Sequence, residues 1–208
     1  MVRIITTLFL LTSFYCLAQK DIELVNKGFS LLEKEKYAEA LTIFNQLVTD
    51  YPSHTLYRYN RGVTLFNLKQ YELSLNDFKK LCKEIPEEPE YFFQAANLME
   101  ILNMTDSVEF YYTVALQLER ENQQYYFKRG TFYLKNNQFT KSIIDFTASI
   151  KLDPEHFNSY HNRGIALYKI GKTENACEDW CKALALGSPV SAMHLDKNCE
   201  KRYRNCFK

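Results

Sequence analysis

A glycine-containing phrase returns at a fixed interval along this chain of 208 residues. It reads YNRGVTLFNLKQY at residues 59–71, FKRGTFYLKNNQF at 127–139 and HNRGIALYKIGKT at 161–173. Gly130 and Gly164 are 34 residues apart, and Gly62 lies twice that distance before Gly130. Gly28 lies a further 34 residues upstream. A constant interval indicates stacked copies of one supersecondary unit, because each copy must bury its apolar face against the next.

The copies alternate small and large residues at fixed positions. Counting from Asp21, position 8 is glycine or alanine in all five blocks, which cover about 21–54, 55–88, 89–122, 123–156 and 157–190. Position 24 is a large aromatic residue throughout, namely Phe44, Phe78, Tyr112, Phe146 and Trp180. Small residues let two helices approach closely, and a large ring fills the space beside them. Proline at position 32 of three blocks ends the second helix, because it has no N–H group to donate.

This small–large pattern on a 34-residue period resembles the tetratricopeptide repeat family, over residues 21 to about 187. The third block departs most, since Ala96, Thr105, Val108 and Arg120 replace the usual Gly, Tyr, Ala and Pro. The resemblance implies an all-α fold, a right-handed superhelical solenoid of antiparallel helix pairs. It also implies one concave surface, lined mainly by the first helix of each pair.

The two ends of the chain lie outside the repeat pattern. Residues 1–18 contain Arg3, an apolar run and then Ala18, which is typical of a secretory signal peptide cleaved before Gln19. An uncleaved anchor is the alternative, although the run is short for a membrane span. We therefore expect an exported protein, periplasmic or extracellular, with five repeats over residues 19–187. At 188–208 we expect a C-terminal capping helix and tail, because Pro189 suits a first helical turn.

Composition argues against several classes of function. Without Arg3 the chain has 25 basic and 25 acidic residues, so no electrostatic footprint for nucleic acid is expected. No phosphate loop, dinucleotide fingerprint or metalloprotease motif occurs. The four histidines are scattered, and no base, orienting partner and pocket are brought together. We predict no catalytic residue, no cofactor and no metal site, and hence a non-enzymatic protein.

The concave surface implied by the resemblance is the candidate binding site. Its positions 5, 9 and 12 include aromatic residues in most blocks, which suit a peptide or protein partner with apolar anchors. The candidate contact residues are Tyr59, Phe93, Phe127, His161, Phe29, Phe66, Asn97 and Tyr168. The alternative is that some of these rings pack between repeats. The carboxylate clamp of some family members is not expected, because Val25, Phe29 and Glu90 replace its cations and amides.

Five cysteines remain after the leader with Cys16 is removed, and helix arithmetic favours one pair. Cys177 lies 10 residues before Gly187 and Cys199 lies 12 after it, about 15 and 18 Å from the turn along two helices. We predict a Cys177–Cys199 disulfide. Cys181 and Cys206 would lie about 9 and 28 Å from the turn and should not pair directly.

Other states of the cysteines stay open. Buried free thiols are one alternative, and a zinc site using Cys177, Cys181 and either Cys199 or His194 is another. Cys82 is expected to be a small buried apolar residue, while the states of Cys181 and Cys206 are undecided.

The sequence thus favours an exported scaffold that binds a protein partner. A structural or self-associating spacer in an envelope assembly is the first alternative. An enzyme or metal carrier using the cysteine-rich end is the second. The partner's identity and the oligomeric state are not specified by these patterns.

Overall fold

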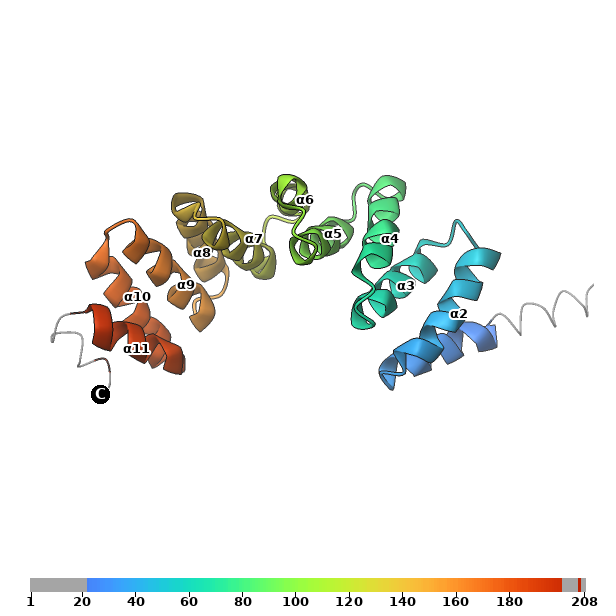
Figure 1. Cartoon of the computed structure of the whole chain (residues 1–208), viewed down its shortest axis with the longest axis horizontal. Helices are drawn as coiled ribbons and strands as arrows, with labels where there is room; N and C mark the ends of the chain where they lie inside the picture. The colour runs from blue at the N-terminus through green and yellow to red at the C-terminus, as the bar shows by residue number, and fades with distance from the viewer. Residues whose placement is uncertain (1–21, 200–205, 207–208) are drawn as a thin grey trace, which may run out of the picture. The chain divides into compact units, whose positions relative to one another are not determined.

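A computed structural model describes residues 22–199 and 206, and the regular structure of these residues is helical, without strands (Figure 1). The chain divides into two compact units, Met1–Met104 and Thr105–Lys208. The expected signal peptide at residues 1–18 lies outside the described residues.

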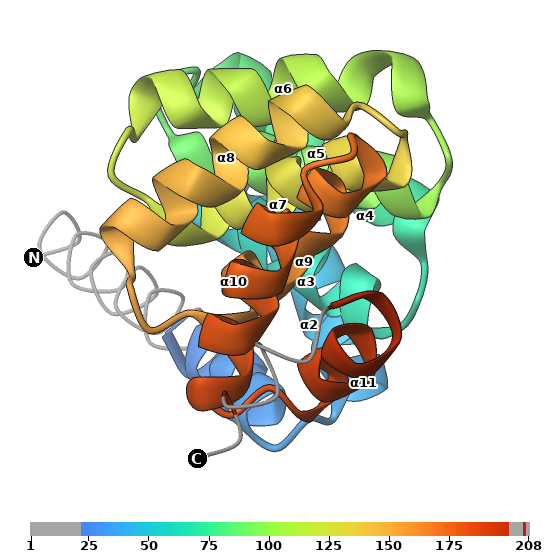
Figure 2. The ribbon, with the colours of Figure 1, turned by 90° about the vertical axis from the view of Figure 1, so that its left-hand side faces the viewer.

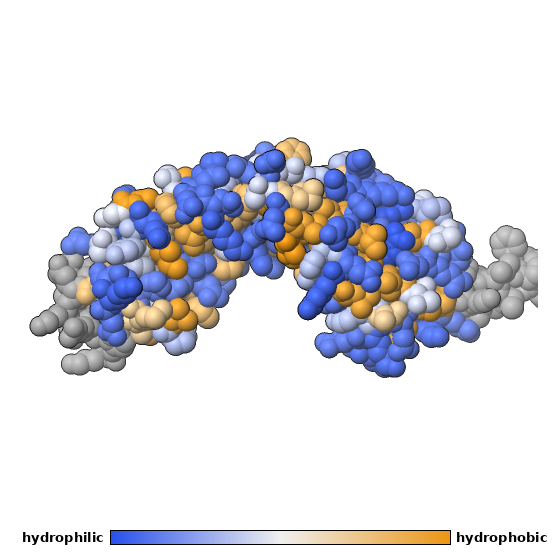
Figure 3. Space-filling model, in the orientation of Figure 1, coloured by the Kyte–Doolittle hydropathy of each residue, from blue (hydrophilic) through white to orange (hydrophobic). Residues whose placement is uncertain are grey.

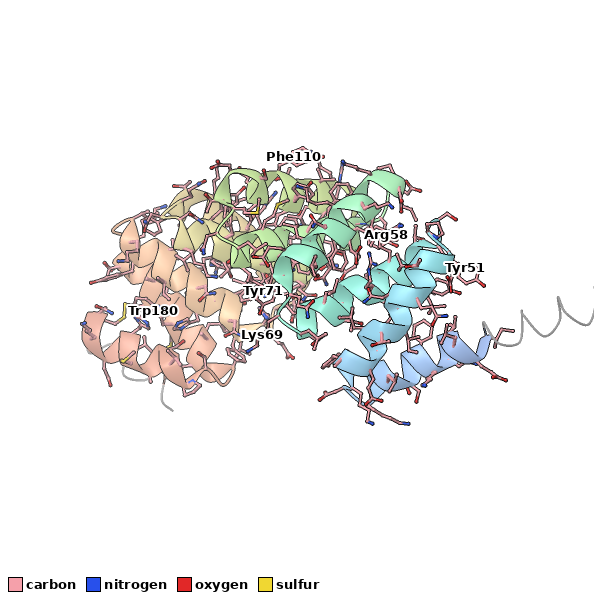
Figure 4. All side chains as sticks on the ribbon, turned by 45° about the vertical axis from the view of Figure 1, so that its right-hand side comes forward. Tyr51, Arg58, Lys69, Tyr71, Phe110 and Trp180 are labelled. Carbon is pink, nitrogen blue, oxygen red and sulfur yellow. A yellow bond between two sulfur atoms is a disulfide. The ribbon has the colours of Figure 1, made fainter. Side chains whose placement is uncertain are left out.

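Unit 1 is a run of antiparallel helices in which each packs on the next. Its helices are one over residues 22–33, then α2 (Tyr37–Asp50), α3 (Thr55–Asn67), α4 (Tyr71–Glu84) and α5 (Pro89–Ile101). The buried Arg58 of α3 pairs with Glu84 at the end of α4 and donates to the Pro52 carbonyl (Figure 4). This cation therefore ties α3 to both the preceding turn and the following helix.

Unit 2 continues the same arrangement and ends in an additional helix (Figure 2). Its helices are α6 (Thr105–Leu118), α7 (Gln123–Lys135), α8 (Phe139–Leu152), α9 (Phe157–Lys169), α10 (Thr173–Ala185) and α11 (Pro189–Asn198). From α7 to α11, each helix packs on its successor. The expected block starts Thr55, Pro89, Gln123 and Phe157 are the first residues of α3, α5, α7 and α9.

The turn inside each block uses a left-handed residue at position 15. Glu35, Lys69, Asn103, Asn137 and Gly171 have φ between 56° and 80°. The following N–H group then donates to a carbonyl five residues back, as Gln138 N does to Tyr133 O over 2.8 Å. This is the Schellman arrangement that ends a helix while satisfying its last carbonyls. The repeated turn fixes the antiparallel return of the chain.

In the structure, the small–large pattern at positions 8 and 24 appears as close packing of the two helices of each block. A Cβ added at Gly62 would lie 2.9 Å from Phe78, and one added at Gly164 would lie 2.6 Å from Nε1 of Trp180. The buried Ser74 hydroxyl donates to the Gly62 carbonyl over 2.7 Å. Position 8 therefore needs a side chain of minimal size, because the ring at position 24 already fills the space.

Three partly buried ion pairs join the two helices of a block. Arg61 with Asp77, Arg129 with Asp145 and Arg163 with Asp179 each form two parallel hydrogen bonds of 2.6 to 2.8 Å. The arginine is at position 7 and the aspartate at position 23 in blocks two, four and five. Block three has Ala95 and Tyr111 there, and the division between the units falls inside this block.

An apolar pocket beside the C-terminal helix

Helix α11 covers the last repeat and is held against it by apolar and polar contacts. Leu195 is buried in one cluster with Leu167, Ala176, Cys177 and Trp180. Gly187 has φ +100°, which suits glycine, and the Ser188 N–H group donates to the Ala183 carbonyl over 2.9 Å. The chain therefore turns sharply after α10, and α11 lies back along it.

Two disulfides join α10 to cysteines that follow α11 in the sequence. Cys177 pairs with Cys199 at a Cα–Cα distance of 5.8 Å, which is the pairing expected from helix arithmetic. Cys181 pairs with Cys206 at a Cα–Cα distance of 5.4 Å. The expectation that these two would not pair was therefore wrong, because it extended a straight helix to Cys206. Helix α11 ends at Asn198, and Cys199 already has extended backbone, with φ −114° and ψ 149°.

The two disulfides count against the alternative of a zinc site built from these cysteines. Four of the cysteines in the described part of the chain are oxidised, so Cys177, Cys181 and Cys199 supply no thiolate to a metal ion. Within that part, no group of three or more potential metal ligands comes together. Cys82 is the free cysteine of the described residues, and burial raises the pKa of its thiol to about 12.

A pocket of about 320 Å³ opens between α9, α10 and α11. Its apolar lining comes from Ile165 and Tyr168 of α9, Trp180 of α10 and Met193 of α11. Figure 4 marks Trp180 at this end of unit 2, and Figure 3 shows hydrophobic and hydrophilic residues side by side on this face of the unit. Tyr168 is 40% exposed and Met193 is 63% exposed. The pocket is therefore open to a partner, and its base is the chain's single tryptophan.

One histidine of α9 and one of α11 face each other, and the second, His194, lines the pocket. The His194 ring stacks on Trp180 with centroids 4.7 Å apart, and it lies 5.2 Å from the His161 ring. His161 Nδ1 is 2.8 Å from the Ser191 hydroxyl, and the Trp180 Nε1–H group donates to the His161 carbonyl over 3.1 Å. Burial lowers the pKa of both imidazoles, helped by their proximity for His161 and by Lys197 for His194. Both rings are therefore mainly neutral at pH 7, and His194 is the one that lines the pocket.

Two residues expected on the concave surface, one on α3 and one on α7, pack against the rings at position 24 and are half-buried. Tyr59 meets Phe78 edge to face at 5.8 Å, and Phe127 meets Phe146 at 5.9 Å. These two rings therefore pack on the aromatic ring of their own block and remain partly exposed.

The other expected contacts differ in how much surface they offer. Phe29 packs on Phe44 at 6.0 Å, Phe66 on Tyr71 at 5.7 Å, and Asn97 is half-buried. Phe93 is only 3% exposed, so in this structure its ring belongs to the core and offers almost no surface. His161 seats α11, and Tyr168 lines the pocket.

Family models identify the repeats along much of the chain. Models described as tetratricopeptide repeat match residues 26–89, 123–156 and 146–178, which together are more than half of the sequence. The chain belongs to the tetratricopeptide repeat family. The expectation drawn from the small–large pattern is confirmed in this respect, and the all-α solenoid fold agrees with it.

Curated relatives of this tetratricopeptide repeat chain are much longer proteins. It is 25% identical over 162 residues to human tetratricopeptide repeat protein 13, covering 76% of this chain and 19% of that protein. It is 24% identical over 181 residues to a DnaJ homolog subfamily C member 7 homolog of Dictyostelium discoideum, covering 78% and 33%. The chain thus spans a third or less of the length of these relatives.

Solved structures show the same repeat fold at low sequence identity. MamA from Desulfovibrio magneticus RS-1 superposes with a TM-score of 0.76 at 18% identity, covering 80% of this chain and 94% of that one. YrrB, described as a tetratricopeptide repeat protein with an unusual peptide-binding site, gives a TM-score of 0.73 at 19% identity, covering 84% and 90%. These similarities establish the solenoid fold of the chain.

Sequence reasoning missed half of the pocket. Met193, His194 and Lys197 lie on α11, which was expected only to shield the last repeat. These residues fall outside the 34-residue period, so no repeat position draws attention to them. A detectable signal was the exposed methionine beside a histidine, one helical turn before a lysine.

Among the described residues, no helix is both long and apolar enough to cross a membrane.

Proposed function

We propose that the protein is a non-enzymatic scaffold that binds a protein partner by inserting one apolar side chain of that partner into the pocket between α9, α10 and α11. The observation that carries this proposal is the accessible apolar lining of the pocket, with Tyr168 and Met193 exposed over Trp180. A rigid aromatic base with flexible neighbours suits an anchor residue, because buried anchors contribute most of the energy of many interfaces.

The half-buried rings Tyr59 and Phe66 in unit 1, and Phe127 in unit 2, are proposed as additional contacts on the first helices. Each lies at a position that the repeat family presents on its concave surface, and each retains accessible surface. The pocket supplies the anchor site, and these rings are proposed as further contacts within their own units. The expected five-repeat organisation is part of this proposal.

We further propose that the protein acts after export, at the cell envelope or outside the cell. The two disulfides support this placement, because such bonds persist in oxidising compartments and are rare in the cytosol. The signal peptide expected at residues 1–18 is the route. The oxidised cysteines also favour a binding module over a metal carrier at this end of the chain.

A peptide selection tests the binding proposal. Residues 19–208 are immobilised, random dodecapeptides displayed on phage are selected, and enriched peptides are titrated against the protein by tryptophan fluorescence. Met193→Asn should weaken binding about fivefold or more, which corresponds to about 1 kcal/mol. Ile144→Asn is the matched control, because Ile144 is equally exposed at 63% and lies on α8 of the same unit. Equal affinities of the two variants would contradict the proposal.

A further inference from the structure

The rim of the pocket is positively charged and carries no compensating acid. Lys169 of α9 and Lys197 of α11 line the pocket, and none of its lining residues is Asp or Glu. Within the described part of the chain, neither lysine takes part in an ion pair, whereas Lys36, Lys80 and Lys141 do. Both lysines thus line one apolar opening, and neither has an ion-pair partner among the described residues.

Helix geometry explains why both charges are placed there. Lys169 lies in the last turn of α9 and Lys197 in the last turn of α11, where the helix dipole stabilises a cation. The turn at Gly187 and the two disulfides bring these helix ends to the same pocket. His194, whose pKa is lowered by burial, adds little charge to the lining at pH 7. The electrostatic character of the opening is therefore set by the two lysines.

Resting on the proposed function, we infer that the partner segment carries a carboxylate, from Asp or Glu, within one or two residues of its apolar anchor. An anchor in the pocket places its neighbours at the rim, where Lys169 and Lys197 are within reach on flexible side chains. A neutral or basic neighbour would leave the lysines unpaired or repel them, so charge selects among apolar segments. The lysines act as specificity-determining residues beside an apolar site.

The expected change in peptide affinity follows from the solvent exposure of both lysines. Solvent-exposed ion pairs are each worth about 0.2 to 1 kcal/mol, so two of them should change affinity by about twofold to thirtyfold. The effect should be lost at about 1 M salt, where the Debye length is about 3 Å. Anchor binding itself should persist at that salt concentration, because burial of apolar surface is not screened.

Defined peptides test the inference on residues 19–208. The probe has the sequence Gly-Ser-Glu-Leu-Glu-Ser-Gly with both termini blocked, so that no terminal carboxylate is present. Its partners replace both Glu by Gln, or Leu by Ala, and a parallel set uses Phe as the anchor. Binding is followed by the indole N–H signal of Trp180 in NMR spectra. The acidic peptide should bind about twofold to thirtyfold more tightly than the amide peptide in low salt.

The controls separate the inference from the proposed function. In Lys169→Gln/Lys197→Gln the acidic and amide peptides should bind equally. They should still differ in Lys151→Gln/Lys182→Gln, whose exposed lysines lie in the last turns of α8 and α10 and do not line the pocket. Equal binding of acidic and amide peptides to the wild-type protein, with the anchor still required, overturns the inference alone. Loss of any dependence on the anchor overturns the proposed function as well.

Discussion

Replacement of Gly164 by alanine tests whether the small–large ladder holds the helix pairs together. The added Cβ would lie 2.6 Å from Nε1, 2.8 Å from Cδ1 and 3.1 Å from Cε2 of Trp180. These are ring atoms of a fully buried side chain, so the ring must move as a whole. That movement also breaks the hydrogen bond from Trp180 to the His161 carbonyl.

Three free-energy contributions decide whether Gly164→Ala lowers or raises the free energy of unfolding. Overpacking of a filled core costs about 1 to 3 kcal/mol, and the lost hydrogen bond about 0.5 to 1.5 kcal/mol. Alanine in a helix interior gains about 1 kcal/mol over glycine. The free energy of unfolding of unit 2 should therefore fall by about 2 kcal/mol for Gly164→Ala.

The other glycines of the ladder provide graded controls. The nearest ring or side-chain atom to an added Cβ is at 2.9 Å for Gly62, 3.0 Å for Gly130 and 3.1 Å for Gly28. Urea unfolding followed by far-UV circular dichroism should rank the losses in that order after Gly164, with Gly28→Ala close to neutral. If Gly164→Ala were instead about 1 kcal/mol more stable than wild type, helix propensity alone would decide and the packing argument would be refuted.

Three further predictions concern the C-terminal end of the chain. Reduction of the two disulfides that join α10 to Cys199 and to Cys206 should lower the free energy of unfolding by up to about 3 kcal/mol per bond, because the bonds close loops of 22 and 25 residues. An unchanged urea midpoint after reduction would count against the two disulfides. Unit 2 should be less stable at pH 5.5 than at pH 7.5, because burial lowers the folded-state pKa of His161 and His194, so the unfolded chain binds more protons as the pH falls below about 6.5; His194→Gln should reduce this dependence in paired melts, and a stability that rises on acidification over that range would oppose the assignment. Residues 19–208 should show one reactive thiol in denaturant and none reacting rapidly when folded at pH 8, because the pKa of the Cys82 thiol is raised to about 12 by burial; three or more thiols in denaturant would exclude the disulfide pairing.

The period of the sequence was enough to predict where helices begin. The block starts Thr55 and Gln123 are first helical residues, and the second helices begin two residues after the left-handed residue at position 15 in every block. The sequence also contained a signal for the ion pairs, because arginine at position 7 and aspartate at position 23 occur together in the same blocks. They were overlooked because residues 16 apart meet only across the helical hairpin.

The pocket could not be predicted from the period, because one of its walls is not a repeat. Met193 and Lys197 acquire their role from the direction in which α11 returns over α10. That direction depends on the turn at Gly187 and on packing of Leu195 beneath it. The same limitation explains the Cys181–Cys206 disulfide, since a straight helix was assumed where the chain leaves helical geometry at Cys199.

Methionine methyl NMR tests the anchor pocket most directly. Residues 19–208 contain three methionines, of which Met193 lines the pocket, Met104 is exposed elsewhere and Met99 is buried. With methyl-labelled methionine and a selected peptide, we predict intermolecular NOEs between the Met193 methyl group and the apolar anchor. The Met104 and Met99 signals should stay unchanged. A peptide that binds while the Met193 methyl signal neither shifts nor shows such contacts would contradict the pocket as the binding site.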